Sequence, residues 1–530
     1  MDDKYGIYVE NKNVIEQKRK KQEEEARQKA VFRKERFLKY GAAGILYTMF
    51  YTFCLYKNTS GITYPFFVAG TLYFYCFCMK KSGITAKRES IFYMAATMLL
   101  GISNVLTDNG AVLIMNRLGI FLLMLSFLLM QYYDDFQWSF GHYAASMCQV
   151  VWGAVTEIFS PYMDFFSFIK LREKKQDSKV KYIVLGLVIG LPLVALALYL
   201  LSSADVMFDY LFTKELWRFL DKLDIWGNFF EIVWKLFLGF EIGYSLFVFL
   251  EKRSLSASRQ KGGQGEPLIG ITATAMLAVV YILFCGVQIV GLFGGVTALP
   301  EGCSYAEYAR EGFFQLLFVC LMNLVLVLCC LGYFRESRTL KILLTVISLC
   351  TYVMTASSAF RMLLYIRSYY LTFLRLFVLW ALAVIALFMA GVLKRIYKDD
   401  FRLFRYGTIV VTVCYLIFSF SRPDYLIAAY NLSAAQTQAA DSGWKGKLLR
   451  TGMEKEVDWY YLYRLSADAA PVLYQWEMDG QDEKLTASEK CWYEDNKEGY
   501  WRRRKEEAEN MGIRGWNVSR YLAERCREHR

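Results

Sequence analysis

The chain has 530 residues, a length that in a soluble protein would suggest three or four domains. Its composition indicates a membrane protein instead, because 55% of the residues are hydrophobic, 17% are aromatic, only 21% are charged, and the apolar residues come in long runs. The formal net charge is +12, and His142 and His529 are its two histidines. This composition excludes intrinsic disorder, a disulfide scaffold and a histidine-rich metal site.

Long apolar runs predict membrane-spanning helices. A span needs about 20 apolar residues, because the hydrocarbon layer is about 30 Å thick and each helical residue adds about 1.5 Å. A backbone in lipid must satisfy its hydrogen bonds within the segment, so we expect an all-α, polytopic transmembrane helical bundle. Eleven stretches meet this length or come close to it: residues 40–56, 62–79, 91–106, 111–130, 182–201, 227–250, 269–293, 313–334, 340–356, 370–393 and 406–420.

Lysine and arginine in the connections predict the orientation of the bundle. Counted from a cytoplasmic N-terminus, the cytoplasmic connections hold about three times as many of these residues as the opposite ones. An odd number of spans then makes the C-terminus extracytoplasmic. Residues 138–169 are aromatic but are interrupted by Glu157, Pro161 and Asp164, so we expect an interfacial or re-entrant helix pair at the inner surface.

The same patterns divide the chain into parts. Its N-terminal segment alternates charges at helical spacing, so it either attracts anionic lipid headgroups or is simply a solvated helix. The expected parts are a charged cytoplasmic segment at 1–39, a four-helix membrane unit at 40–132, an interfacial segment at 133–180, a seven-helix membrane unit at 181–421 with a cytoplasmic linker at 252–267, and an extracytoplasmic helical module at 422–530.

The C-terminal module is polar, yet it holds six of the twelve tryptophans. A disordered tail would lack such aromatics, so we expect a small folded helical module. Cys491 and Cys526 can pair there or remain free thiols, and the sequence leaves both options open. Ser466 and Asp468 precede a short helix and are expected to cap it, not to catalyse.

Ionisable residues at membrane depth are expensive and are therefore candidates for function. Glu231 and Lys235 are four residues apart, so we expect them to neutralise each other. Glu241 lies between Gly239 and Gly243, where it can carry a proton or cation, as in a transporter, or serve a structural role. The intramembrane set comprises Arg117, Glu231, Lys235, Glu241 and Arg375.

A second charged group comes from four connections and is expected at the outer ends of the helices. Its arginines suit carboxylate or phosphate ligands. These residues either pair with one another and seat the C-terminal module, or bind an anionic lipid or lipid-linked envelope precursor. The group comprises Asp205, Glu307, Arg310, Glu311, Arg361, Arg367 and Arg375.

Several short motifs on this outer side carry a family resemblance. They are Leu201-Ser202-Ser203-Ala204-Asp205 with Phe208, the run from Tyr305 to Phe314, Ser358-Ala359-Phe360-Arg361 with Tyr365, Leu371-Thr372 with Arg375, Pro423-Asp424-Tyr425-Leu426-Ile427-Ala428 with Asn431, and Leu465-Ser466-Ala467-Asp468-Ala469 with Pro471. From about residue 182 onward the chain resembles a family of polytopic membrane proteins of Gram-positive bacteria, catalogued as domain of unknown function 4173. The resemblance implies a bacterial plasma membrane and an unassigned activity, with no catalytic residue.

The chain departs from that family at two positions. The family tends to have Gly where Tyr370 stands and Asn where Arg422 stands. We therefore expect the turns beside Arg375 and Asp424 to be the places where local geometry can differ.

Together these features predict a non-enzymatic membrane protein that binds an envelope component or a membrane partner protein at its outer face. No cofactor, metal or catalytic residue is predicted. The expected partner is the lipid bilayer, and binding of nucleic acid is not expected. A transporter or flippase of an anionic or lipid-linked substrate is the alternative. An envelope-modifying enzyme comes third and would need Asp205 or Glu311 close to Arg361.

Overall fold

A computed structural model describes most of the chain. The described residues are 2–58, 60–134, 138, 140–172, 225–252, 265–293, 313–440, 457–481, 485 and 487–529, together with the isolated positions 186, 190, 194, 197 and 201. Within these residues the elements are helices, and the β-type pairing present is an isolated bridge between Gly265 and Phe334. The predicted all-α fold is confirmed.

The chain forms two compact units. Unit 1 comprises Met1–Tyr56, Gly70–Ala86 and Cys148–Ser254. Unit 2 comprises Lys57–Ala69, Lys87–Met147 and Leu255–Arg530.

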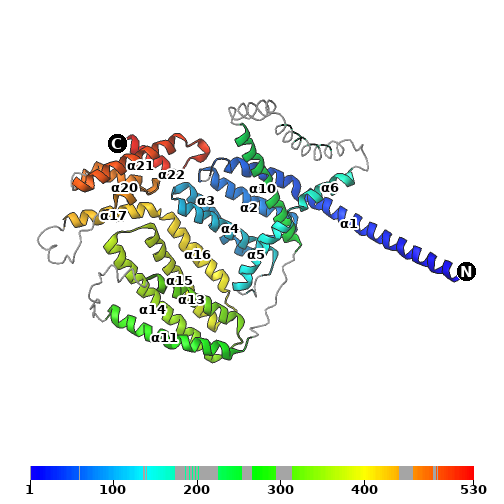
Figure 1. Cartoon of the computed structure of the whole chain (residues 1–530), viewed down its shortest axis with the longest axis horizontal. Helices are drawn as coiled ribbons and strands as arrows, with labels where there is room; N and C mark the ends of the chain where they lie inside the picture. The colour runs from blue at the N-terminus through cyan, green and yellow to red at the C-terminus, as the bar shows by residue number, and fades with distance from the viewer. Residues whose placement is uncertain are drawn as a thin grey trace. The chain divides into compact units, whose positions relative to one another are not determined.

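Unit 1 is built on one long helix, α1 (Asp2–Leu55), drawn in blue in Figure 1. Against it pack α6 (Ser160–Arg172) and α10 (Ile225–Glu251). Most of α2 (Thr63–Lys81) and the end of α5 (Phe140–Thr156) also belong to this unit. The predicted helix pair at 138–169 is thus present as α5 and α6.

A glycine brings two helices of unit 1 close together. A Cβ on Gly239 of α10 would lie 2.5 Å from Thr48 Oγ1 of α1, so only glycine fits this crossing. The Thr48 hydroxyl donates a hydrogen bond to the Leu236 carbonyl at 2.8 Å. Glu241 therefore lies beside a tight helix crossing.

Unit 2 contains the larger helical bundle. Within it α11 packs on α14, α14 on α15, α15 on α16, and α3 on α4. Long apolar runs let each helix form, and their buried faces make a common core among α11, α13, α14 and α15. The helices are α3 (Ile91–Leu106), α4 (Gly110–Tyr132), α11 (Pro267–Phe293), α13 (Phe313–Tyr333), α14 (Arg338–Tyr369), α15 (Phe373–Tyr397), α16 (Leu403–Phe420) and α17 (Pro423–Ala440).

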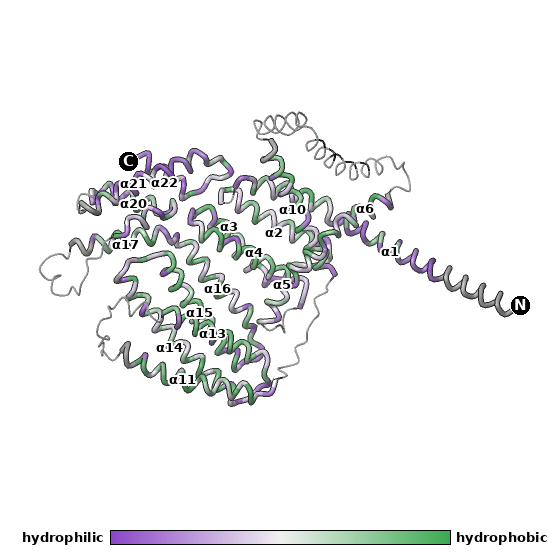
Figure 2. Tube along the Cα trace, viewed as in Figure 1, coloured by the Kyte–Doolittle hydropathy of each residue, from purple (hydrophilic) through white to green (hydrophobic). Residues whose placement is uncertain are grey.

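The C-terminal module of unit 2 is helical, as predicted. Trp459, Trp476 and Trp501 are buried in a core that continues into the ends of α13, α14 and α15. Figure 2 shows the hydrophilic character of its helices, in purple, against the greener helices of the bundle. The module's elements are α19 (Trp459–Leu462), η4 (Ala467–Ala469), α20 (Ala470–Met478), α21 (Ala487–Glu509), η6 (Ile513–Gly515) and α22 (Val518–Glu528).

Eight helices in the described part of the chain are long and apolar enough to cross a membrane. They are Arg88–Leu106, Gly110–Tyr132, Phe229–Glu251, Pro267–Ile289, Phe313–Tyr333, Arg338–Arg367, Phe373–Tyr397 and Leu403–Phe420. The chain is therefore a multi-pass membrane protein in contact with the lipid bilayer.

The predicted count of eleven spans stays a prediction. The expected spans 40–56 and 62–79 lie in α1 and α2, which are not among the eight candidates and whose apolar runs are rich in Tyr and Thr. The expected span 182–201 lies outside the described residues, apart from its isolated positions.

One predicted boundary is wrong. The expected span 340–356 is part of α14, which continues to Tyr369, so Arg361 and Arg367 lie on a helix and not in a loop. Hydropathy detects only the part of a helix that suits lipid, whereas residues 357–369 continue the helix without a Pro or Gly. The helix ends at Tyr370, whose φ is +66°.

Candidate functional site

The predicted outer charge cluster can be followed through three of its four arginines, Arg361, Arg367 and Arg375. Its other members, Asp205, Glu307, Arg310 and Glu311, lie outside the described residues.

Arg375 closes the end of a helix. From the first turn of α15 its guanidinium donates to the Tyr369 carbonyl at 2.6 Å and to the Tyr370 carbonyl, and it lies 4.2 Å from the centre of the Tyr365 ring. Cations are favourable at a helix C-terminus, where carbonyls lack helical partners. Arg375 therefore stabilises the junction between α14 and α15.

Arg361 has a different position from Arg375. It is buried, and its Nη2 donates to Gln288 Oε1 of α11 at 3.3 Å, while the Ser357 hydroxyl donates to the same oxygen at 2.7 Å. Arg367 is exposed further along α14. In the described contacts, Arg361 joins α14 to α11, whereas Arg375 acts at the helix end.

The predicted intramembrane residues do not form one cluster but have three different environments. Lys235 pairs with Glu231 at 2.5 Å and donates to the Leu55 carbonyl of α1 at 3.0 Å. Glu241 is 1% exposed and shares a hydrogen bond with Tyr162, while its Oε2 has no hydrogen-bond partner in the described part of unit 1. Arg117 is half-buried on α4 of unit 2.

Unit 2 contains a buried ionic network that the sequence analysis did not identify. We call it the module joint; it comprises Thr107, Asp108, Arg422, Asp468, Arg504, Asn517, Ser519 and Arg520. Asp468 is fully buried and accepts hydrogen bonds from Thr107 Oγ1 at 2.5 Å and from the Ser519 hydroxyl. Arg422 Nη2 lies 3.4 Å from the same carboxylate.

Asp108 is the second acidic centre of the joint. It follows α3 and accepts from Arg504 Nη1 at 3.2 Å and from Arg520 Nε at 2.7 Å. The charge-assisted hydrogen bonds therefore connect the α3–α4 turn to α21 and α22.

Asn517 completes the joint at the start of α22. Its amide nitrogen donates to the carbonyls of Ser60, Asn104 and Thr107 at 3.2, 3.2 and 3.0 Å, and its oxygen accepts from the Ser519 amide at 2.9 Å. One side chain thus caps a helix and satisfies three carbonyls.

The electrostatics of Asp468 suit a structural acceptor. Burial raises the pKa of its carboxyl group, although hydrogen bonds from Ser519 and Thr107 and the charge of Arg422 act in the opposite direction. Both carboxylate oxygens already accept hydrogen bonds, so the group is held in place by its neighbours.

The family motifs meet next to this joint. Asn431 accepts from the Leu371 amide at 2.7 Å and donates to the Leu371 carbonyl at 2.9 Å. Asp424 accepts from the Ser466 amide at 2.9 Å. Motifs that are distant in the sequence therefore connect the α14–α15 turn, α17 and the module.

The two positions at which the chain departs from the family that it resembles lie where the backbone is unusual. Tyr370 and Arg422 have φ angles of +66° and +51°, values that Gly and Asn adopt more readily than other residues. Arg375 bonds the Tyr370 carbonyl, and Arg422 itself reaches Asp468, so tertiary contacts hold both turns.

Local predictions for the module can also be compared with its structure. The Ser466 hydroxyl caps η4 by accepting from the Asp468 amide, as predicted, whereas the Asp468 side chain belongs to the joint. Cys491 is an exposed free thiol and Cys526 a half-buried one.

A neutral polar cluster, which carries no signal of charge in the sequence, also lies at membrane depth. Asn116 of α4 is fully buried and accepts from Tyr415 at 2.8 Å and from Ser419 at 2.9 Å, and it donates to Asn104 at 3.1 Å. Hydrogen bonds of this kind join helices within a bilayer.

Comparison with known proteins places the chain in a family. No curated protein and no solved structure matches it. Residues 94–476, more than half of the chain, match the family described as Domain of unknown function (DUF4153). That stretch includes Asp108, Asn431 and Asp468, so part of the joint lies within the matched region. The chain belongs to this family of uncharacterised integral membrane proteins.

Proposed function

We propose that this protein is a non-enzymatic protein of the bacterial plasma membrane, whose C-terminal module binds an envelope component or a partner protein on the outer side. The module joint carries the proposal. Asp108, Asp468 and Asn517 are all used to fix the module on the bundle, which favours a rigid binding platform over a catalytic cleft. A Gram-positive source and the family type 4173 rest on the motifs and belong to the same proposal.

The charge distribution of unit 2 supports an outer position for the module. The module packs where α3 and α14 end and where α15 begins. The opposite helix ends carry basic residues, including Lys87, Arg338, Lys394, Arg395 and Arg405. Basic ends are retained in the cytoplasm, so the module end faces outward.

The module offers exposed apolar side chains for such binding. Trp492 is 67% exposed, Ile513 is 91% exposed, and Tyr460 is 54% exposed. Aromatic residues are enriched at protein interfaces, because they bury a large area at a low entropic cost.

In-cell photo-crosslinking tests this proposal. A photoreactive amino acid at Trp492 or Ile513 should give a discrete adduct in intact cells, whereas one at the exposed, charged Glu509 of α21 should not. Protease treatment would identify a protein partner, and cell-wall hydrolase treatment would identify a wall polymer. The adduct should disappear in Asp468→Ala, which loosens the module. An absence of adducts from both apolar positions, or equal adducts from all three, contradicts the proposal.

Transport is a second candidate, and one observation favours it. Glu241 is buried within a candidate span and keeps one carboxylate oxygen without a hydrogen-bond partner in the described part of unit 1. Glu241→Gln keeps the size of the side chain but removes its charge. If growth and ion or lipid flux are unchanged in this variant while Arg361→Ala abolishes the phenotype, the transport candidate loses its best residue. The enzyme candidate would need a cleft that brings Asp205 or Glu311 near Arg361 and the outer module, and both acids lie outside the described residues.

A further inference from the structure

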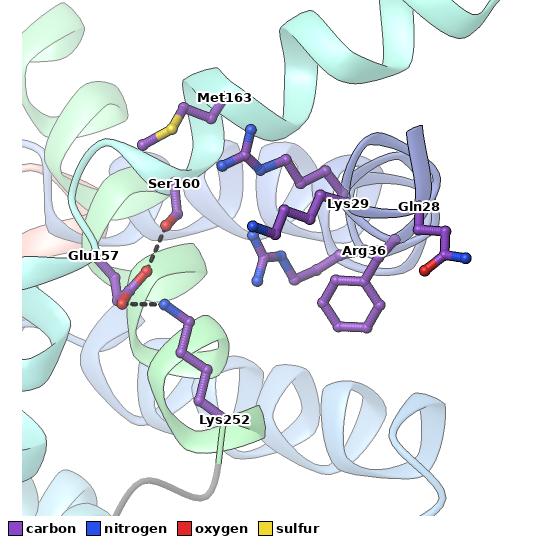
Figure 3. Close-up of a pocket in the computed structure, with 9 residues that line it drawn as sticks. Gln28, Lys29, Arg36, Glu157, Ser160, Met163 and Lys252 are labelled. Atoms are coloured by element: carbon purple, nitrogen blue, oxygen red, sulfur yellow. Dashed lines mark hydrogen bonds and ion pairs between the residues drawn. The ribbon is translucent and has the colours of Figure 1, made fainter. Parts of the chain in front are cut away.

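Unit 1 contains an open cavity with a basic lining. Its volume is about 470 Å³, and it lies between α1, the turn before α6 and the end of α10. Figure 3 shows Lys29 and Arg36 projecting from α1 toward Glu157, Ser160 and Lys252. Arg33 also lines the cavity.

The acidic groups around the cavity are already neutralised. Asp164 accepts two hydrogen bonds from Arg36, at 2.6 and 2.7 Å, and Glu157 pairs with Lys252. Nearby, Glu251 pairs with Lys39 at 2.5 Å. Each of these three carboxylates therefore has its own cation.

Lys29 and Arg33 are the cavity-lining cations that these acids leave unpaired. Neither has an ion pair or a side-chain hydrogen bond in the described part of the chain. They are four residues apart, so they share one face of α1 with Arg36, and like charges at this spacing repel each other. A bound anion would relieve that repulsion, and a guanidinium beside an ammonium suits a phosphate group.

Helix α6 next to the cavity has an inverted pattern. It buries polar side chains, including Asp164 and Ser160, and exposes Phe159 just before it together with Met163 and Phe166. A helix facing water would expose its polar side. An apolar outward face beside a basic cavity is typical of a helix lying at the lipid interface.

We propose that this cavity binds the phosphate of an anionic phospholipid, with Lys29 and Arg33 contacting the headgroup and the acyl chains lying along the exposed face of α6. The apolar face decides between a lipid and a free phosphate ion, because a free ion would gain nothing from Met163 or Phe166. This site is separate from the module joint and does not depend on the function proposed for the module.

Lipid retention by the full-length protein tests the proposal. The purified protein in detergent is titrated with phosphatidylglycerol or phosphatidylcholine, and bound lipid is counted by native mass spectrometry. The wild type should prefer phosphatidylglycerol. The double variant Lys29→Gln with Arg33→Gln should lower its affinity about tenfold, because each near-surface cation favours an anionic lipid by a severalfold factor.

Two variants serve as controls. Arg27→Gln with Lys34→Gln removes the same charge from α1 at positions that do not line the cavity, and its affinity should stay within about twofold of the wild type. Lys29→Arg with Arg33→Lys keeps both charges and should retain most of the preference. Circular dichroism checks that each variant is folded, which we expect because Lys29 and Arg33 lose no ion pair or side-chain hydrogen bond within the described residues.

Three results would overturn the proposal. The first is an equal loss in the cavity and control variants, which would indicate general surface charge. The second is a wild type that retains both lipids equally. The third is displacement of phosphatidylglycerol by millimolar inorganic phosphate, which would make a free phosphate ion the ligand.

Discussion

The module joint of unit 2 and the basic cavity of unit 1 both concentrate charge, but they differ in how it is paired. In the joint Asp108 contacts two arginines, and Asp468 contacts Arg422 and two hydroxyl groups. At the cavity Asp164 pairs with Arg36 and Glu157 pairs with Lys252, while Lys29 and Arg33 have no acidic partner in the described part of the chain. Complete pairing indicates charge that holds the fold, whereas surplus charge of one sign facing a cavity indicates charge that is available to a ligand.

This comparison matters energetically because a buried charge is costly once its partner is removed. A buried pair adds little net stability over an apolar replacement, but breaking it leaves an uncompensated charge. Exposed cations lack this penalty. Mutations in the two regions should therefore differ in their effect on the free energy of unfolding.

The largest effect is expected in the joint. Asp108→Ala would leave Arg520 without its carboxylate, and Arg504, which is 8% exposed, with Glu507 as its one remaining acidic partner in the described part of the chain. We expect a loss of about 3–5 kcal/mol in the free energy of unfolding, measured by denaturant titration in detergent with tryptophan fluorescence. Asp479→Ala, an exposed aspartate at the end of α20, is the matched control and should change little. Equal effects of the two variants would show that the joint does not hold the module.

A smaller effect is expected within unit 1, where both kinds of charge occur on one helix. Arg36→Gln leaves the fully buried Asp164 with Tyr244 as its remaining hydrogen-bond donor and should cost about 3 kcal/mol. Lys29→Gln, seven residues earlier, should stay within about 0.5 kcal/mol of the wild type. Thermal unfolding in detergent gives both values, and a large loss for Lys29→Gln would remove the distinction between paired and surplus charge.

The left-handed turns allow a third comparison in unit 2. Lys57 has a φ of +50°, so Lys57→Gly should relieve strain and stabilise the protein by about 1 kcal/mol. Arg422→Asn suits the same backbone but loses the contact with Asp468, so it should destabilise the protein by about 1 kcal/mol. Urea titration measures the change in the free energy of unfolding for each variant, and its sign shows whether backbone strain or the lost contact dominates. Stabilisation by Arg422→Asn would mean that the Asp468 contact contributes nothing.

The smallest effects concern pH and should have opposite signs in the two regions. Burial raises the pKa of Asp468, so its contribution is fully present below the unfolded pKa of about 3.9 and is lost as the pH rises through the folded pKa. Although burial acts to raise it, hydrogen bonds from Lys252 and Ser160 lower the pKa of Glu157 overall, so that contribution is lost as the pH falls through the folded pKa.

Matched amide variants isolate these two slopes. Asp468→Asn should remove the loss of stability on raising the pH from about 4, and Glu157→Gln should remove the loss on acidification. For Glu157→Gln the change in the free energy of unfolding should be about 1 kcal/mol or less, because Lys252 is half-exposed. Melting temperatures between pH 3 and pH 8 provide the measurement, and slopes of the same sign would contradict the assignment.

Much of the fold could be predicted from the sequence because apolar run length has a direct physical cause. The expected span 91–106 coincides with α3, and the span at 313–334 differs from α13 by one residue. The end of α14 could not be predicted in this way, because polar helical turns beyond the lipid carry no hydropathy signal. The positive φ angles at Tyr370 and Arg422 coincide with the two positions at which the chain departs from the family that it resembles.

The charged sites were less accessible to sequence reasoning. In the sequence Asp164 interrupts an apolar segment, whereas in the structure it is the buried partner of Arg36, 128 residues away. Arg504 and Asp108 are 396 residues apart, and no local pattern links them. The polar run at Thr107 and Asp108 between two apolar helices was the available signal, but it indicates a turn and not its distant partner.

The central claim is that the module, seated by its joint, lies outside the cytoplasm. Labelling of Cys491 in intact cells tests this most directly, because its thiol is exposed on α21. In a variant that keeps Cys491 alone, a membrane-impermeant maleimide should react before permeabilisation. A variant with its only cysteine at the exposed Arg335, at the opposite helix ends of unit 2, should react only afterwards. The reverse order of labelling would contradict the account.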